Sequence, residues 1–273
     1  MKQYFPYLSP PYKRWQRRAR LLLILFLVIA FFYFWHSPVM NEFSGREPQK
    51  AQKRVKEDGQ KDRVGEQIDY DVCLGKVKVG NAKYNHIKKM MFKGRLVHFI
   101  TFQAKVMRFR DRETIYCDTE TFLPIVVERK VSQFLKPEKI KEEYDQEKFV
   151  LRITKERFTK EEHVIKKDAP IHNSILLPYV VRNTKNPEIG WSFEVNLPQR
   201  KYDVVLSAIE TVNVPAGEFQ AYYFESKPQQ IKIWVSTDEN RIPLKLEGTG
   251  GMLGYKLLMR EYSLPEKKVP TSH

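Results

Sequence analysis

The sequence has few of the residue patterns on which enzyme and metal sites are built. It contains two cysteines and six histidines in 273 residues, and none of them forms a Cys-x-x-Cys, His-x-His or His-x-x-x-His spacing. Gly-x-Ser-x-Gly, Walker and dinucleotide-binding patterns are also absent. These absences argue against a zinc knuckle, a redox pair, a serine hydrolase and a nucleotide-dependent enzyme. We therefore predict no catalytic residue, no metal ligand and no cofactor.

The two cysteines, Cys73 and Cys117, lie in or at the ends of predicted strands. Outside the cytoplasm they could form a disulfide bond. The other interpretation is a pair of buried thiols that act as small hydrophobic side chains. The sequence leaves both interpretations open, because it does not show whether the two side chains can meet.

Acidic residues are too few to balance the basic ones. The chain carries 48 Lys and Arg against 33 Asp and Glu, which gives a formal charge of +15. Six basic residues and no acid lie in residues 1–40, and residues 41–65 add seven basic and five acidic side chains. The remaining charge of +7 is spread over residues 66–273 among many acids. This distribution differs from a stripe that follows phosphates, so no nucleic-acid partner is predicted.

Only one long hydrophobic run occurs, the fifteen apolar residues of 21–35. With its flank, the segment 21–40 is long enough to span a membrane. The basic tail 1–20 ends directly before this run, which favours a cytoplasmic N-terminus. A cleaved signal peptide is the alternative, but bulky rather than small residues follow the run. We predict an uncleaved signal anchor in the inner membrane, with the rest of the chain in the periplasm.

The chain after the anchor divides into three parts. Residues 41–64 are almost entirely polar or charged, so we predict a flexible linker. Residues 65–264 carry a continuous β pattern and are predicted to form one domain. Residues 265–273 are predicted to be a disordered tail.

The β pattern is clearest between residues 209 and 247, and Ile209 is expected to point into the core. Pro215 and Gly217 predict a tight turn, because proline fixes φ and glycine accepts a positive φ. Pro243 is predicted to open a strand after a second turn over residues 236–240. About a dozen strands are expected, in a mainly β fold with one large antiparallel sheet that is curled or barrel-like. The predicted strands before residue 170 are 67–73, 76–85, 95–109, 114–117, 124–131, 143–145, 149–155 and 162–166.

Two further features refine this fold. Residues 170–186 interrupt the strand pattern and predict one short helix capped by Asn173, which Pro178 would kink or shorten, with two turns as the alternative. Residues 115–120 with Pro124 parallel residues 233–238 with Pro243. This echo indicates one hairpin geometry used twice, with a duplicated half-domain as the alternative.

Several segments resemble one known family. Val-Pro-Ala-Gly-Glu-Phe at 214–219 is followed by Ile-Trp-Val-Ser-Thr-Asp-Glu-Asn-Arg-Ile-Pro-Leu-Lys-Leu-Glu-Gly at 233–248. Upstream, residues 65–72 and 78–82 look like that family's opening strand and glycine-containing hairpin. The family is that of exported bacterial proteins catalogued as domain of unknown function number three thousand one hundred and eight. The resemblance implies a mostly-β envelope domain without established catalytic residues.

Aromatic residues make up 13% of the sequence and are expected mainly in the core. The alternative is an apolar trough in the curled sheet that holds a lipid-like ligand. We predict a non-catalytic, membrane-tethered envelope domain that binds a lipid-like hydrophobic ligand or an envelope partner. A structural or scaffolding protein with a filled core is the second hypothesis, and an envelope hydrolase is the third.

Overall fold

The computed structural model describes residues 62–133, 136–184, 187–248 and 254–265. The predicted tail 1–20, the anchor 21–40 and all but the last residues of the linker lie outside this part. So do residues 266–273 of the predicted C-terminal tail. Within the described ranges, no helix is long and apolar enough to cross a membrane.

The described residues form one antiparallel sheet of fourteen strands. This confirms the predicted mainly β fold with one large sheet. The strands are β1 (Gln67–Leu74), β2 (Val77–Phe92), β3 (Arg95–Val106), β4 (Phe109–Asp118), β5 (Pro124–Gln133), β6 (Lys136–Asp145), β7 (Val150–Glu156), β8 (Lys160–Lys166), β9 (Ser192–Asn196), β10 (Lys201–Val214), β11 (Gly217–Lys227), β12 (Ile231–Ser236), β13 (Pro243–Gly248) and β14 (Tyr255–Ser263).

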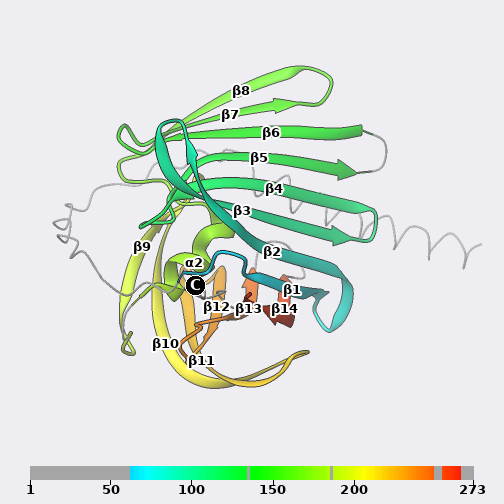
Figure 1. The fold of residues 1–273 in the computed structure, drawn as a ribbon, viewed down its shortest axis with the longest axis vertical. Helices are drawn as coiled ribbons and strands as arrows, with labels where there is room; N and C mark the ends of the chain where they lie inside the picture. Colours follow the sequence, from blue (N-terminus) through cyan, green and yellow to red (C-terminus); the bar gives the residue numbers. More distant parts are fainter. Residues whose placement is uncertain (1–61, 134–135, 185–186, 249–253, 266–273) are drawn as a thin grey trace, which may run out of the picture.

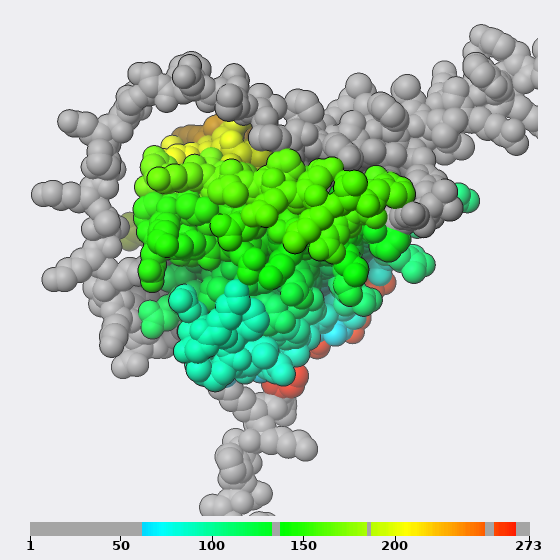
Figure 2. Space-filling model, turned by 90° about the horizontal axis from the view of Figure 1, so that it is seen from above, coloured from blue at the N-terminus to red at the C-terminus, as the bar shows by residue number. Residues whose placement is uncertain are grey.

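The sheet consists of two meanders joined at their ends. Strands β1–β8 pair in sequence order and form the upper arm, while β9–β14 form the lower arm, and β14 pairs with β1. Figure 1 shows the upper arm as one layer with the lower arm curving beneath it. In the described chain β8 and β9 are the two free ends of the sheet, so the predicted curled sheet is open rather than closed. Figure 2 shows the outer surface of the upper arm as a continuous layer of side chains.

The connection from β8 to β9 places the predicted short helix inside the curled sheet. A 3-10 turn, η1 (Ser174–Leu176), leads into α2 (Leu177–Arg182). The Asn173 side chain accepts a hydrogen bond from the Ile175 amide, and Pro178 lies in the first turn of α2, where proline is tolerated. Leu176, Leu177 and most of α2 are buried, so this crossover covers the inner face of the sheet (Figure 1).

Aromatic side chains fill the space around α2. Tyr179 of the helix stacks on Phe122 with ring centres 5.4 Å apart, and it packs against Tyr84 of β2 at 6.2 Å. Tyr84 in turn contacts Phe102 of β3 at 4.7 Å and Tyr70 of β1 at 5.8 Å. All five side chains are buried. This part of the interior is therefore packed with the protein's own side chains, as the core interpretation of the aromatics predicted.

Four sequence predictions need correction. The predicted strand 95–109 is two strands, because the chain turns at Met107, which has a φ of 51°. Strand β2 continues well past its predicted end, to Phe92, and β6 begins before the predicted residues 143–145. Ile209 is 49% exposed, although we expected it in the core. Even-numbered residues of β10 such as Val204 and Val212 face the core, so the strand alternation places Ile209 outside.

Candidate anion-binding groove

The outer face of strands β2–β5 carries a shallow hollow of about 460 Å³, which we call the outer groove. Side chains two residues apart along a strand point to the same face, so each strand contributes a pair of polar residues. The outer groove is lined by Asn81, Lys83, Gln103, Lys105, Arg110, Arg112, Lys130 and Ser132, together with Ala104 and Asp111, which alternate with these residues and direct their side chains to the other face.

The cations of the outer groove face one another across neighbouring strands. Lys105 of β3 lies directly opposite Arg110 of β4, and Arg112 of β4 lies opposite Lys130 of β5. Like charges at directly opposed positions destabilise a sheet. All four side chains are exposed, and none of them forms an ion pair with another described residue. The outer groove therefore holds positive charge that the described protein does not neutralise.

Among the described residues, only one groove cation has an acidic partner. The Nζ atom of Lys83 lies 3.2 Å from Oδ1 of Asp69 in β1. At the other edge of the groove, Lys139 of β6 extends the row of cations, because it is the cross-strand partner of Lys130. The positive surface thus spans β3 to β6, with Asp69 on the β1 side and Glu156, the cross-strand partner of Lys139 in β7, on the other.

Exposed apolar side chains lie at the end of the sheet beyond the outer groove. A bulge in the pairing of β2 with Val72 and Cys73 interrupts the alternation of faces between Val77 and Asn81. The Met107 amide donates a hydrogen bond to the Val79 carbonyl, which brings the β3–β4 turn alongside. Val77 is 65% exposed and Met107 60% exposed. A cationic hollow next to an apolar strip suits an amphiphilic anion.

The opposite, inner face of the same strands carries buried carboxyl groups. Arg129 Nε donates to Asp111 Oδ1 at 2.8 Å and lies 3.3 Å from Glu113 Oε1. The Tyr144 hydroxyl donates to Glu142 Oε2 at 2.5 Å. These side chains are all less than a tenth exposed. Three carboxyl groups thus surround one guanidinium group out of reach of solvent.

Burial controls the protonation of this cluster. It raises the pKa of Glu113 to about 8 against the opposing effect of Arg129, and Asp111 and Glu142 raise it further. Burial also raises the pKa of Glu142, although the hydrogen bond from Tyr144 and the charge of Arg129 oppose the shift. Across the described ranges, no group of three or more His, Cys, Asp or Glu could hold a metal ion. The cluster is suited to joining strands rather than to contacting a substrate.

Two of the scattered histidines meet in the core, which the sequence spacing did not reveal. His86 Nε2 lies 2.8 Å from His98 Nδ1, and His98 Nε2 lies 3.2 Å from the Thr119 carbonyl. A carbonyl only accepts hydrogen bonds, so His98 carries its hydrogen on Nε2 and accepts the bond from His86 through Nδ1. Burial lowers the pKa of His86 to about 3 and that of His98 to about 4. Both rings are therefore neutral at physiological pH.

The other two histidines of the domain do not join this pair. His163 is exposed on β8, where its Nε2 atom lies 3.8 Å from a Glu161 oxygen. His172 accepts a hydrogen bond from the Asn196 amide, which fixes the crossover to β9. Neither arrangement brings a histidine to the outer groove or to the buried carboxyl cluster.

A family model described as "Protein of unknown function (DUF3108)" matches residues 69–258. The chain belongs to this family. The DUF3108 match begins in β1 and ends in β14, so it covers the whole order of strands. It confirms the resemblance noted from the turn and strand motifs, and its description names no activity.

Solved structures resemble this DUF3108 protein only distantly. A β-barrel-like protein of the DUF1849 family from Brucella abortus has a TM-score of 0.47 at 8% identity, covering 74% of this chain and 98% of its own. A protein from Bacteroides fragilis, described as exported and with a YmcC-like fold, has a TM-score of 0.29 at 11% identity, with coverages of 73% and 96%. A protein described as a lipoprotein from Parabacteroides distasonis has a TM-score of 0.25 at 11% identity, with coverages of 73% and 95%. No curated protein matches significantly in sequence.

The two cysteines of the DUF3108 domain are buried and free. Cys73 pairs with Lys78 near the start of β2, whereas Cys117 pairs with His98, whose partner in β2 is Lys89. Eleven residues of strand separate Lys78 from Lys89, which corresponds to about 35 Å. The cysteines therefore lie toward opposite ends of the upper arm, too far apart for the disulfide that the sequence left open.

The structural residues predicted in the lower arm lie where the turns require them. Val214 pairs with Gly217, so Pro215 and Ala216 form a two-residue loop between β10 and β11. Gly217 has a φ of +133°, which a side chain would strain. Pro243 is the first residue of β13, where a missing amide hydrogen costs little.

Proposed function

We propose that this DUF3108 protein is a non-catalytic envelope module that binds an anionic lipid in its outer groove. The observation that carries the proposal is the two pairs of directly opposed cations, Lys105 with Arg110 and Arg112 with Lys130, which have no acidic partner among the described residues. Such like-charge pairs cost stability, so a bound anion that neutralises them gives a reason for their presence. The exposed Val77 and Met107 give the apolar part of a lipid a surface beside the headgroup.

The proposal includes the location expected from the sequence. Residues 21–40 anchor the protein in the inner membrane with the N-terminus in the cytoplasm, and residues 41–64 form the linker. A phosphatase reporter fused after residue 64 is expected to be active, because it would lie in the periplasm. The full-length protein is also expected in the membrane pellet. An inactive reporter, or a shortened protein in the soluble fraction, would contradict the anchor.

The lipid proposal is tested by measuring which lipids remain with the full-length protein after extraction in mild detergent. Mass spectrometry should detect an anionic lipid with the parent protein and several-fold less with the double variant Arg110→Gln/Arg112→Gln. The matched control is Lys160→Gln/Lys166→Gln, which removes two exposed charges from β8. All three proteins share the hydrophobic segment, so lipid held by that segment cancels in the comparison. Equal lipid content in all three would overturn the groove assignment.

A structural or scaffolding role is the second candidate, because aromatic packing around α2 fills the described interior. Under this role the outer groove needs no lipid, and the two charge variants would behave alike in the extraction experiment. An envelope hydrolase has less support, since the buried carboxyl groups are sealed inside the sheet.

A further inference from the structure

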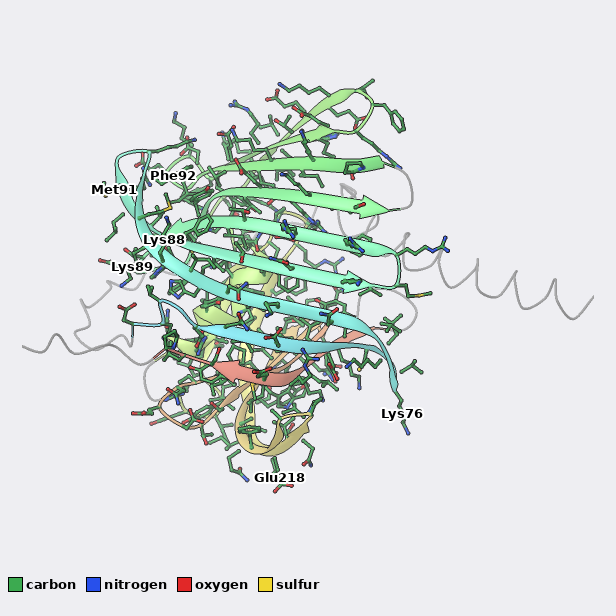
Figure 3. The ribbon with its side chains drawn as sticks, turned by 45° about the vertical axis from the view of Figure 1, so that its right-hand side comes forward. Lys76, Lys88, Lys89, Met91, Phe92 and Glu218 are labelled. Atoms are coloured by element: carbon green, nitrogen blue, oxygen red, sulfur yellow. The ribbon has the colours of Figure 1, made fainter. Side chains whose placement is uncertain are left out.

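We propose that the hairpin between β2 and β3, residues 87–96, rests on the anionic surface of the membrane that anchors the protein. This inference rests on the anchor of the proposed function, but it concerns a different surface from the outer groove. The hairpin lies at the opposite end of the strands from the β1–β2 turn, as the labels of Met91 and Lys76 in Figure 3 show.

Three large apolar side chains are exposed on this hairpin. Met91 is 63% exposed, Leu96 50% and Ile87 43%. Met91 and Leu96 are cross-strand partners, so their side chains are adjacent. The turn at Lys93 and Gly94 lies directly beyond them, and both turn residues have positive φ. The tip therefore presents an apolar patch at the extreme end of two long strands.

Cations surround this apolar patch. They are Lys88, Lys89, Lys93 and Arg95. Asp62 Oδ1 lies 3.7 Å from the Lys89 ammonium group, and Glu143 Oε1 lies 3.2 Å from that of Lys93. Lys88 and Arg95 form no ion pair within the described ranges. An apolar tip with excess positive charge has the composition of a surface that binds anionic bilayers.

The path of the chain brings the hairpin to the membrane side of the domain. Asp62, the first described residue, lies beside Lys89. The Gly65 amide then donates to the His86 carbonyl at 2.7 Å, and the His86 amide donates to the Glu66 carbonyl at 2.9 Å. The chain therefore enters the domain at the hairpin end of β2, and the other end of this strand lies about 50 Å away. The hairpin is thus the end of β2 nearest to the proposed anchor.

A second copy of this chain fits the hairpin less well than a bilayer does. A two-fold contact would place the same patch against itself. Lys88 and Arg95 of one copy would then approach the same cations of the other, and like charges in an interface oppose association. Anionic lipid headgroups complement these charges instead.

The test uses the full-length protein reconstituted in vesicles. An environment-sensitive fluorophore is attached to Met91→Cys, and since Cys73 and Cys117 are buried, the introduced thiol reacts selectively. Glu218→Cys, on the β10–β11 hairpin at a different end of the molecule, is the control (Figure 3). A quencher carried on the lipid acyl chains should quench the Met91 probe several-fold more than the Glu218 probe. This difference should appear with phosphatidylglycerol in the vesicles and shrink with phosphatidylcholine alone.

Removal of charge from the hairpin is the second part of the experiment. Lys88→Gln/Arg95→Gln, added to the Met91 probe, should lower its quenching while the protein stays in the vesicle fraction. Equal quenching of both probes, or quenching that ignores lipid charge, would overturn the hairpin contact and leave the anchor intact. A protein that does not remain with the vesicles would overturn the anchor and this inference together. A probe signal in detergent that grows with protein concentration would assign the tip to a second copy and overturn the proposal.

Discussion

Glu113 shows how burial changes a residue that the sequence presents as an ordinary strand carboxylate. Its pKa is raised from 4.5 to about 8, mainly by burial. The folded protein then binds a proton that the unfolded chain releases above pH 4.5. The stability from this group is therefore complete below pH 4.5 and declines as pH rises toward 8, by at most about 1.4 kcal/mol per pH unit.

Replacing Glu113 by Gln should remove this decline, because the amide cannot ionise. We expect Glu113→Gln to lose little stability at pH 5 and to become more stable than the parent protein at pH 8. Urea unfolding of both proteins across this range measures the difference. A parent stability that rises between pH 5 and 8, with a parallel curve for the variant, would show that the carboxyl group is ionised in the fold.

The histidine pair should make the folded protein less stable as the pH falls, which is opposite to the effect of Glu113. His86 and His98 have pKa values of about 3 and about 4, below the ordinary 6.5, because burial disfavours the charged rings. Their contribution is present above pH 6.5 and is lost as pH falls through 4, since the unfolded chain takes up protons first. We expect His86→Phe/His98→Phe to flatten the acid side of the stability curve, measured by urea unfolding between pH 4 and 7. Glu113→Gln is the control, because it should leave the slope between pH 6.5 and 4.5 steep.

At the scale of elements, several hairpins share one turn geometry. Asp118 accepts hydrogen bonds from the Glu120 and Thr121 amides, and Asp238 accepts them from the Asn240 and Arg241 amides. Two residues before the proline that starts the next strand, Phe122 and Arg241 both have a positive φ. The similarity between residues 115–120 and residues 233–238 in the sequence therefore corresponds to a repeated turn. The β6–β7 turn also uses it, through Asp145 and a positive φ at Phe149.

The β10–β11 turn permits a direct test of backbone strain. Gly217 has a φ of +133°, and a β-branched side chain there is strained although space is available. We expect Gly217→Val to destabilise the protein by about 1–3 kcal/mol. Ala216→Val, one residue earlier and also exposed, is the matched control and should change stability by less. Thermal melts of the full-length protein compare them, and a melting temperature for Gly217→Val equal to that of the control would contradict this role of the turn.

Much of the fold could be predicted because strand alternation and turn residues are local signals. Asn173 as a cap and Pro243 as a strand start follow from single residues and their neighbours. The turn at Met107 could not be predicted, because no glycine or proline marks it. Pairing depends on register between distant segments, so the opposition of Arg112 and Lys130 and the contact of His86 with His98 have no signal in spacing alone. Candidate sites made by neighbouring strands thus needed the structure.

For the whole molecule, one buried ion pair ties the crossover helix to both arms. Arg182 of α2 donates to both oxygens of Glu66 before β1, at 2.6 and 2.8 Å, and also to the Asn240 carbonyl between β12 and β13 at 2.8 Å. Both charged side chains are fully buried. The charge of Glu66 and its hydrogen bonds raise the pKa of Arg182 against the effect of burial. The guanidinium group therefore links upper arm, helix and lower arm.

Breaking this link on one side should weaken the whole sheet. Arg182→Met leaves the buried charge of Glu66 with only the charge of Arg63 and the Tyr262 hydroxyl beside it, so we expect a loss of up to about 3–5 kcal/mol. The double variant Glu66→Gln/Arg182→Met removes the stranded charge and should recover part of that loss, because an uncharged pair has a smaller desolvation cost. Urea unfolding of parent, single and double variants gives the coupling energy between the two residues. If the single variant unfolds within about 1 kcal/mol of the parent, water reaches Glu66 and the two arms do not depend on this link.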